Sequence, residues 1–152
     1  MQQKNNLSLS VQYPDSRLKE TITRSKLRRW VQAALLAPAE LTIRFVDADE
    51  GRMLNHEYRG KDYATNVLTF AYTEEEDSEV TQADIVLCTD VLQREALEQG
   101  KSIVAHTAHL VVHGVLHAQG YDHETEAEAA EMEQLEIDIL ASLGETNPYA
   151  VA

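Results

Sequence analysis

Three histidines in the second half of the chain have the residue type and the spacing of a metal site. His113 and His117 are four residues apart, and His123 closes the segment HGVLHAQGYDH, residues 113–123. In a helix, residues four apart lie on one face about a turn apart, so both imidazoles can bind the same ion. Gly120 can adopt the left-handed conformation that ends a helix, and the reversal can bring His123 back as a third ligand.

Three neutral imidazoles with one open position are typical of a catalytic centre, because structural zinc sites normally have four protein ligands. Water at the open position has its pKa lowered to about 7, which makes hydroxide available at neutral pH. We therefore expect one zinc ion per chain, with His113, His117 and His123 as its ligands. Three imidazoles also bind nickel and copper well, so the spacing leaves these two metals open.

The same spacing occurs in the long zinc-protease signature H-E-x-x-H-x-x-G-x-x-H. One position differs, because Gly114 replaces the glutamate that acts as general base in those proteases. A metallopeptidase, or another metal-dependent hydrolase, is therefore an alternative that lacks its usual base. His109 and Asp122 are candidates to orient a ligand or to act as base, although a turn explains Asp122 equally well. His106 is expected at a helix cap or on the surface.

The hydrophobic pattern predicts the elements that hold this site. Alternation of apolar and polar residues predicts strands at 7–13, 41–47, 66–72 and 83–89. Apolar spacings of three and four predict helices at 16–36, 49–58, 90–98, 102–119 and 125–143. Asp90 is expected to cap the third of these helices, and the acidic run at 74–79 is expected to be a solvated hairpin loop.

Two of these helices bear directly on the histidines. The helix over 102–119 is apolar on nearly every face, which indicates a central, buried position. The helix over 125–143 has one apolar face and one glutamate-rich face, and we expect the latter to be solvated. The order of elements predicts an α+β (α/β-like) fold, in which a mixed four-stranded sheet packs against helices and a central buried helix carries the metal site. A length of 152 residues favours a single domain over 1–152.

Composition limits the cellular setting and the class of partner. The lone cysteine, Cys88, indicates a reducing compartment, and it is expected to be a small core residue. No segment has the apolar length of a signal peptide or of a membrane span, so we expect a cytoplasmic protein without a membrane partner.

Charge is distributed unevenly along the chain. The net charge is −13, with about +4 on residues 1–61 and about −17 on residues 62–152. An acidic total argues against non-specific nucleic-acid binding, which depends on neutralising phosphates. The basic first part could still form a local surface, although solvated positions are the favoured interpretation. Its members are Arg17, Lys19, Arg24, Lys26, Arg28, Arg29, Arg59 and Lys61.

The histidine segment, together with LNHEYRGKDYATNVLTFAY (54–72) and ADIVLC (83–88), resembles the YbeY family of bacterial metal-dependent endoribonucleases. The resemblance covers about residues 40–125. It implies an enzyme that matures ribosomal RNA, especially the 3′ end of the small-subunit RNA, and that acts in ribosome quality control. It also implies ribosomal RNA as substrate, with ribosomal proteins or assembly factors as partners.

The resemblance assigns roles to particular residues. His113, His117 and His123 match the family's zinc ligands, and Arg59 matches an arginine regarded as functionally important. Arg59 and His113 are thus the catalytic candidates, and Arg59 with Lys61 the substrate-binding ones. A guanidinium facing the metal could clamp a phosphodiester and stabilise the charge that develops on it. Without the resemblance, an ion pair of Arg59 with a nearby acid, Asp62 or Glu57, would rank first.

The chain departs from the family pattern without losing a metal ligand. Ala64 and Ala71 stand where proline is common, Asn66 replaces aspartate, Thr69 replaces serine and Ala83 replaces glycine. Asn66 removes any argument that needs a carboxylate at that position.

A third hypothesis is a non-catalytic ribosome-assembly module, in which the metal only stabilises the fold and the basic first part docks on a partner.

Overall fold

A mixed four-stranded sheet forms the centre of the molecule. The computed structural model describes residues 6–72, 80–121 and 124–149. The strands lie in the order β1-β2-β4-β3, and β3 is antiparallel to β4 whereas the other pairs are parallel. Their bounds are Leu7–Gln12 (β1), Ala39–Val46 (β2), Val67–Ala71 (β3) and Thr81–Cys88 (β4). The α+β fold with a mixed four-stranded sheet, expected from the pattern, is confirmed.

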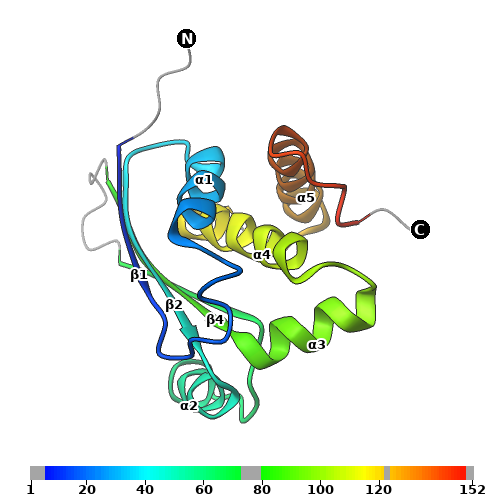
Figure 1. Cartoon of the computed structure of the whole chain (residues 1–152). Coiled ribbons are helices and arrows are strands. Elements are labelled where there is room, and N and C mark those ends of the chain that lie inside the picture. The colour runs from blue at the N-terminus through cyan, green and yellow to red at the C-terminus, as the bar shows by residue number, and fades with distance from the viewer. Residues whose placement is uncertain (1–5, 73–79, 122–123, 150–152) are drawn as a thin grey trace.

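Helices cover one face of this sheet, with α4 at their centre (Figure 1). Helix α4 contacts α1, α3 and α5 as well as β3 and β4, so it is enclosed on nearly every side. This explains why its sequence is apolar all round. The helices are Arg24–Ala34 (α1), Ala48–Arg59 (α2), Thr89–Gln99 (α3), Ile103–Ala118 (α4) and Glu126–Ser142 (α5). None of the helices in the described part of the chain is both long and apolar enough to cross a membrane.

The two faces of the sheet differ in polarity. Alternate residues along each strand point toward the helices, and the row Val11, Ile43, Ile85 and Thr69 crosses all four strands in register. The opposite face is largely polar, except where α2 covers a second apolar cluster. That cluster contains Val46, Leu68, Val86, Cys88 and Val91, with Ala48, Leu54, Ala64 and Phe70 packed against it. Cys88 is thus buried in a core, and burial raises the pKa of its thiol.

Helix α1 begins later than the pattern predicts. The prediction of a helix from residue 16 is wrong, because residues 17–22 form turns and the helix begins at Arg24. Thr23 is the N-cap, and its hydroxyl accepts a hydrogen bond from Lys26 N–H at 3.3 Å. Leu18 and Ile22 are buried before the helix starts, so their apolar spacing comes from packed turns and resembles a helical period.

Asp90 was expected to cap α3, and this prediction is wrong. Helix α3 has no side-chain cap at its N-terminus. The Asp90 carboxylate instead accepts hydrogen bonds from Ala48 N–H, at the start of α2, and from Arg17, each at 2.7 Å. The loop predicted at 74–79 lies outside the described residues.

Candidate metal centre

His113 and His117 project from one side of α4, a turn apart. Their ring centroids are 4.7 Å apart and their planes are nearly perpendicular, at 81°. The helix begins at Ser102, whose hydroxyl accepts a hydrogen bond from Ala105 N–H at 3.0 Å. Between this cap and the buried packing of its other faces, α4 holds both imidazoles toward one cavity.

After α4 the chain returns to the same cavity. Gly120 has a φ of 101°, a conformation that strains any residue with a side chain, and its N–H donates to the carbonyl of His117 at 3.0 Å. Glu124 lines the cavity together with His113 and His117. Within the described residues no group of three metal-ligating side chains is found, and His123, the expected third ligand, lies outside them.

A buried carboxylate on α5 contacts the first of these histidines. Glu136 is completely buried, and one of its oxygens pairs with His113 Nδ1. The other oxygen lies 3.3 Å from His109 Nε2 and accepts a hydrogen bond from the Tyr149 hydroxyl. Burial alone would raise the pKa of Glu136, but the bonds from His109, His113 and Tyr149 outweigh it and lower the pKa to about 2. The carboxylate is therefore held ionised beside His113.

Sequence reasoning missed Glu136. The glutamate-rich face of the last helix was expected to be solvated, and for Glu136 that expectation is wrong. Its position still carries a signal, because Glu136 is four residues after Met132 and four before Leu140, both of which are buried. A glutamate in line with two core residues is one that the fold must pair.

The C-terminal segment completes the surroundings of Glu136. Tyr149 lies edge-on to His109, with ring centroids 5.3 Å apart, and Lys101 Nζ donates to the carbonyl of Pro148 at 3.2 Å. Burial and the hydrogen bond to Glu136 raise the pKa of Tyr149, so this hydroxyl stays protonated and donates. The tail after α5 thus closes over the carboxylate.

The remaining site candidates fall in different places. His109 shares Glu136 with His113, whereas Asp122 lies outside the described residues. His106 is 3% exposed and pairs with Glu95 at 3.0 Å, which corrects the expectation of a cap or surface position.

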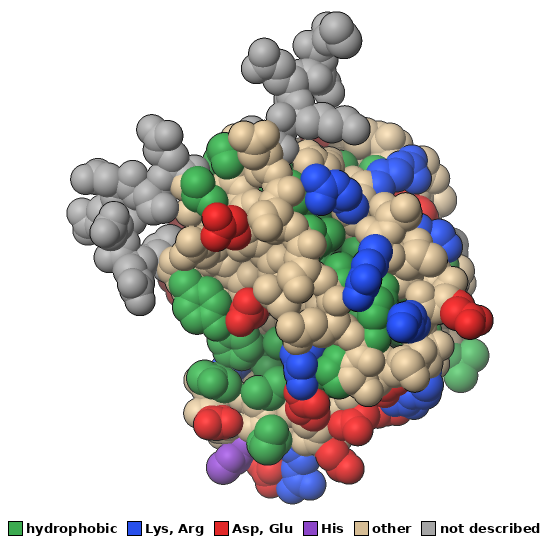
Figure 2. All heavy atoms as spheres, turned by 60° about the vertical axis from the view of Figure 1, so that its left-hand side comes forward, with side chains coloured by type: hydrophobic (Ala, Val, Ile, Leu, Met, Phe, Trp, Pro, Cys, Tyr) green, Lys and Arg blue, Asp and Glu red, His purple; other side chains and the backbone are tan. Residues whose placement is uncertain are grey.

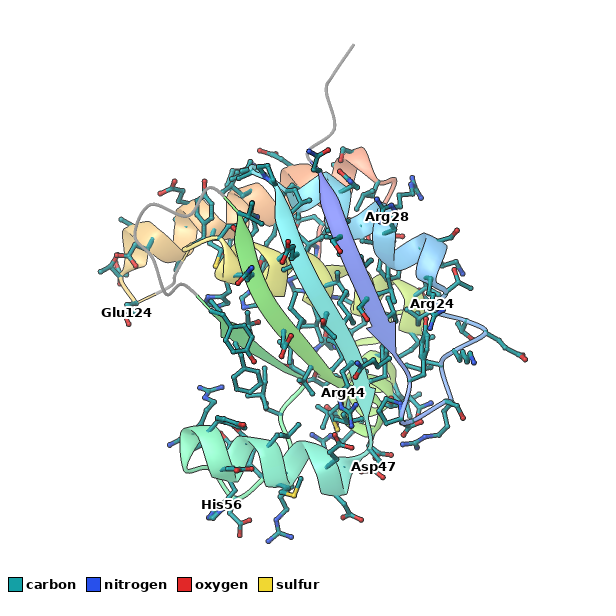
Figure 3. All side chains as sticks on the ribbon, turned by 90° about the vertical axis from the view of Figure 1, so that its left-hand side faces the viewer. Arg24, Arg28, Arg44, Asp47, His56 and Glu124 are labelled. Atoms are coloured by element: carbon teal, nitrogen blue, oxygen red, sulfur yellow. The ribbon has the colours of Figure 1, made fainter. Side chains whose placement is uncertain are left out.

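The cavity beside the histidines has a volume of about 750 Å³. It runs from His113 and His117 past β3 to the end of α2, where Tyr58 and Arg59 line it. Figure 3 shows Glu124 on the β3 side of the sheet. The other lining residues are Thr65, Asn66, Val67, Leu68, Thr69, Phe70, Ala71 and Glu124.

Arg59 is placed at this cavity by the end of α2. Gly60 follows it in the left-handed conformation, with φ of 69°. Asp62, one of the two expected partners, pairs instead with Arg52 at 2.7 Å. Within the described residues Arg59 makes no ion pair, so its positive charge is available to a ligand in the cavity. Lys61 is exposed just beyond the turn and is not among the described residues that line the cavity.

Gly114 faces the sheet. A Cβ at this position would lie 3.2 Å from Ile85 Cγ2 and 3.3 Å from Thr69 Oγ1. Even a methyl group would be crowded there, so the position that carries the general base of the zinc proteases has no room for a glutamate side chain.

Asn66 fixes the loop that enters β3. Its amide donates to Glu95 at 3.0 Å, and its side-chain oxygen accepts from Val67 N–H at 2.7 Å. Because Glu95 also binds His106, the amide joins the cavity wall to α3 and α4. An amide suits this position because one end faces a donor and the other a carboxylate.

Fold and site together define a small α+β protein in which a buried helix presents paired histidines to a cavity that also holds an arginine. A family model described as endoribonuclease YbeY matches residues 4–144. The chain therefore belongs to the YbeY family of endoribonucleases, as its motifs predicted.

Two curated relatives match over nearly their whole length. Endoribonuclease YbeY of Janthinobacterium sp. (strain Marseille) is 76% identical, with 98% of both chains covered. That of Herminiimonas arsenicoxydans is 65% identical, with 99% of both covered. The solution structure of TM1509 from Thermotoga maritima superposes with a TM-score of 0.55 at 24% identity, covering 94% of this chain and 99% of the other. At that identity the likeness supports the fold alone.

Proposed function

We propose that this chain is a metal-dependent endoribonuclease that cleaves single-stranded ribosomal RNA, in maturation of the small-subunit 3′ end and in ribosome quality control. Family membership supports the endoribonuclease activity. The observation that carries the site is the opening of His113, His117 and Arg59 onto one cavity. A lone buried cysteine is consistent with a cytoplasmic enzyme.

His113, His117 and His123 would hold one zinc ion, with nickel and copper as alternatives. The surroundings of His113 fit such a ligand, because its Nδ1 is bound to a buried carboxylate and metal-binding histidines characteristically bind a carboxylate or carbonyl through their other nitrogen. Glu124, next to His123 in the chain, already lines the cavity. When bound, the ion supplies Lewis acidity toward the phosphodiester and lowers the pKa of water to about 7.

The side chains of the protein bind the substrate and orient the histidines. Arg59 clamps the phosphodiester with its planar guanidinium and stabilises the negative charge that develops during cleavage. Lys61, exposed just beyond the turn at Gly60, adds a second positive charge two residues after Arg59. Glu136 holds the Nδ1 proton of His113, and His109 with Tyr149 holds Glu136 in place. Asp122 remains a candidate base.

Metal analysis and RNA cleavage test this proposal together. His117→Ala is expected to lose both the bound metal and the cleavage of a single-stranded ribosomal RNA fragment. The matched control is His56→Ala, because His56 is exposed on α2 and its side chain points away from the sheet (Figure 3). The control should keep metal and activity. RNA cleavage by His117→Ala after complete loss of metal would overturn the proposal and point to a contaminating nuclease.

A substitution of Arg59 distinguishes a nuclease from a non-catalytic assembly module. Arg59→Glu reverses the charge at the cavity, and we expect cleavage to fall at least about 100-fold while the metal content stays unchanged. Normal ribosomal RNA processing in cells that carry this variant would favour the assembly module, with ribosomal proteins or assembly factors as its partners. Peptidase activity has no structural support, because position 114 has no room for the glutamate base.

A further inference from the structure

A row of aromatic side chains runs from α2 to β3 on the outer face of the molecule. Tyr58 in the last turn of α2 is 62% exposed, and Tyr72 just after β3 is 51% exposed. Phe70 lies on the same face of β3 as Tyr72, and its ring centroid is 4.9 Å from that of Tyr58. Figure 2 shows hydrophobic side chains gathered at the lower left of this face.

Packing and a hydrogen bond hold the row of aromatic side chains in place. Phe70 packs against the second apolar cluster, so it forms a fixed support on which the Tyr58 ring leans at 58°. The Tyr72 hydroxyl donates to Asp84 at 2.8 Å, which fixes the end of the row. Folding does not explain the position of Tyr58, because a ring that is 62% exposed buries little apolar surface.

Tyr58 and Phe70 line the same cavity as His113, His117 and Arg59. Two aromatic rings thus adjoin the paired histidines and the arginine. Building on the proposed function, we propose that Tyr58 and Phe70 form a stacking site for one unpaired base of the RNA substrate, next to the phosphodiester that is cleaved.

Nucleic-acid chemistry favours this occupant. Proteins bind single-stranded RNA by stacking splayed bases on aromatic rings, and every base has a face suited to this. A base within a duplex is stacked on both sides and cannot present its face to Tyr58. The adjacent Arg59 supplies the phosphate contact that a stacked nucleotide also needs. The site therefore selects RNA that is unpaired at this nucleotide.

The test combines a protein substitution with removal of a base. Binding of a labelled single-stranded ribosomal RNA fragment to the metal-loaded protein is measured by stopped-flow anisotropy, before cleavage occurs. Tyr58→Ala is expected to weaken binding about 5- to 150-fold, the value of one stacked base. A scan of single abasic sites along the RNA should show one position that weakens wild-type binding by a similar factor. At that position the abasic site should have no further effect on Tyr58→Ala.

Two variants serve as controls. Tyr58→Phe keeps the ring and should bind as the wild type does. Tyr63→Ala removes a tyrosine that is 58% exposed and, in the described part of the chain, does not line the cavity, so it should leave binding unchanged. Equal RNA binding by Tyr58→Ala and wild type would overturn the stacking site and leave the face to a protein partner. Additive losses from Tyr58→Ala and every abasic site would overturn it too. Absence of RNA cleavage by the wild-type protein would instead overturn the proposed function.

Discussion

In the proposed metal site, each nitrogen of the His113 imidazole has a separate role. Nδ1 pairs with Glu136, which favours the tautomer with its proton on that nitrogen, and Nε2 is then the atom that would bind the proposed metal. Because Glu136 is completely buried, the pair is not weakened by exchange with water. His109 and Tyr149 occupy the second carboxylate oxygen, so the orientation of His113 depends on residues that need not touch a metal.

Glu136→Gln is expected to weaken zinc binding about 10- to 100-fold, the usual effect of removing a carboxylate behind a ligating histidine. The amide is nearly isosteric, so the fold should persist. Zinc affinity is measured by competition with a chelator, and thermal unfolding of the metal-free protein reports on the fold. Glu133→Gln, at an exposed position of the same helix, is the matched control. Unchanged zinc affinity in Glu136→Gln would show that the carboxylate does not position His113.

At the scale of elements, α1 protects the open edge of the sheet. Arg24 and Arg28 donate to the carbonyls of Val11 and Leu7 in β1, at 3.1 and 3.2 Å. Figure 3 shows both arginines beside β1, at the opposite edge from Glu124. An edge strand exposes unpaired backbone groups that invite aggregation, and cations are a common protection. Part of the basic first half of the chain therefore serves the fold, and these two arginines are distant from the cavity.

The sequence pattern predicted which helices and strands form more accurately than where they end or which of them contact one another. The buried helix that bears His113 and His117 was predictable because its period, its Ser102 cap and its Gly120 turn all agree. The start of α1 was not, because packed turns at 17–22 resemble a helical period. The burial of Glu136 was not predicted either, because residue type alone does not distinguish a buried glutamate from a solvated one. Only the packing of α5 on α4 distinguishes them.

The packing of α4 on the sheet depends on Gly114. In Gly114→Ala, better helix propensity would stabilise by about 1 kcal/mol. The new methyl group would however meet Ile85 and Thr69, which lie on neighbouring strands of the packed sheet and cannot easily withdraw. Overpacking typically costs about 1–3 kcal/mol, so we expect a net loss of roughly 1 kcal/mol in the free energy of unfolding. Urea denaturation measures it, and a variant at least as stable as wild type would show that the sheet can yield.

At the scale of the whole molecule, the site draws on segments that are far apart in the chain. Arg59 ends α2, the two histidines lie on α4, Glu136 comes from α5 and Tyr149 from the tail. The sheet and α4 bring them together, so the local patterns of any one segment do not reveal the assembly. Only the histidine spacing was local enough to be predicted as a chemical group.

A second long-range contact joins three segments of the chain. Arg17 pairs with Asp15 and with Asp90, and Asp90 also accepts from Ala48 N–H. The loop after β1 is thereby tied to the starts of α2 and α3. Hydrogen bonds from Arg17 lower the pKa of both Asp15 and Asp90.

These lowered pKa values predict how stability changes with pH. A carboxyl group whose pKa is lower in the folded state stabilises the fold above its unfolded pKa of about 3.9, and this contribution is lost as the pH falls through the folded value. Asp90→Asn should therefore lower the free energy of unfolding at pH 7 by about 1 kcal/mol or less, because water screens a pair whose side chains are 45% and 38% exposed. The difference from wild type should shrink below about pH 4. Urea denaturation at pH 7, 5 and 3 measures this, with the exposed Glu57→Gln as control. A difference that stays constant down to pH 3 would mean that Asp90 acts through its shape and not through its charge.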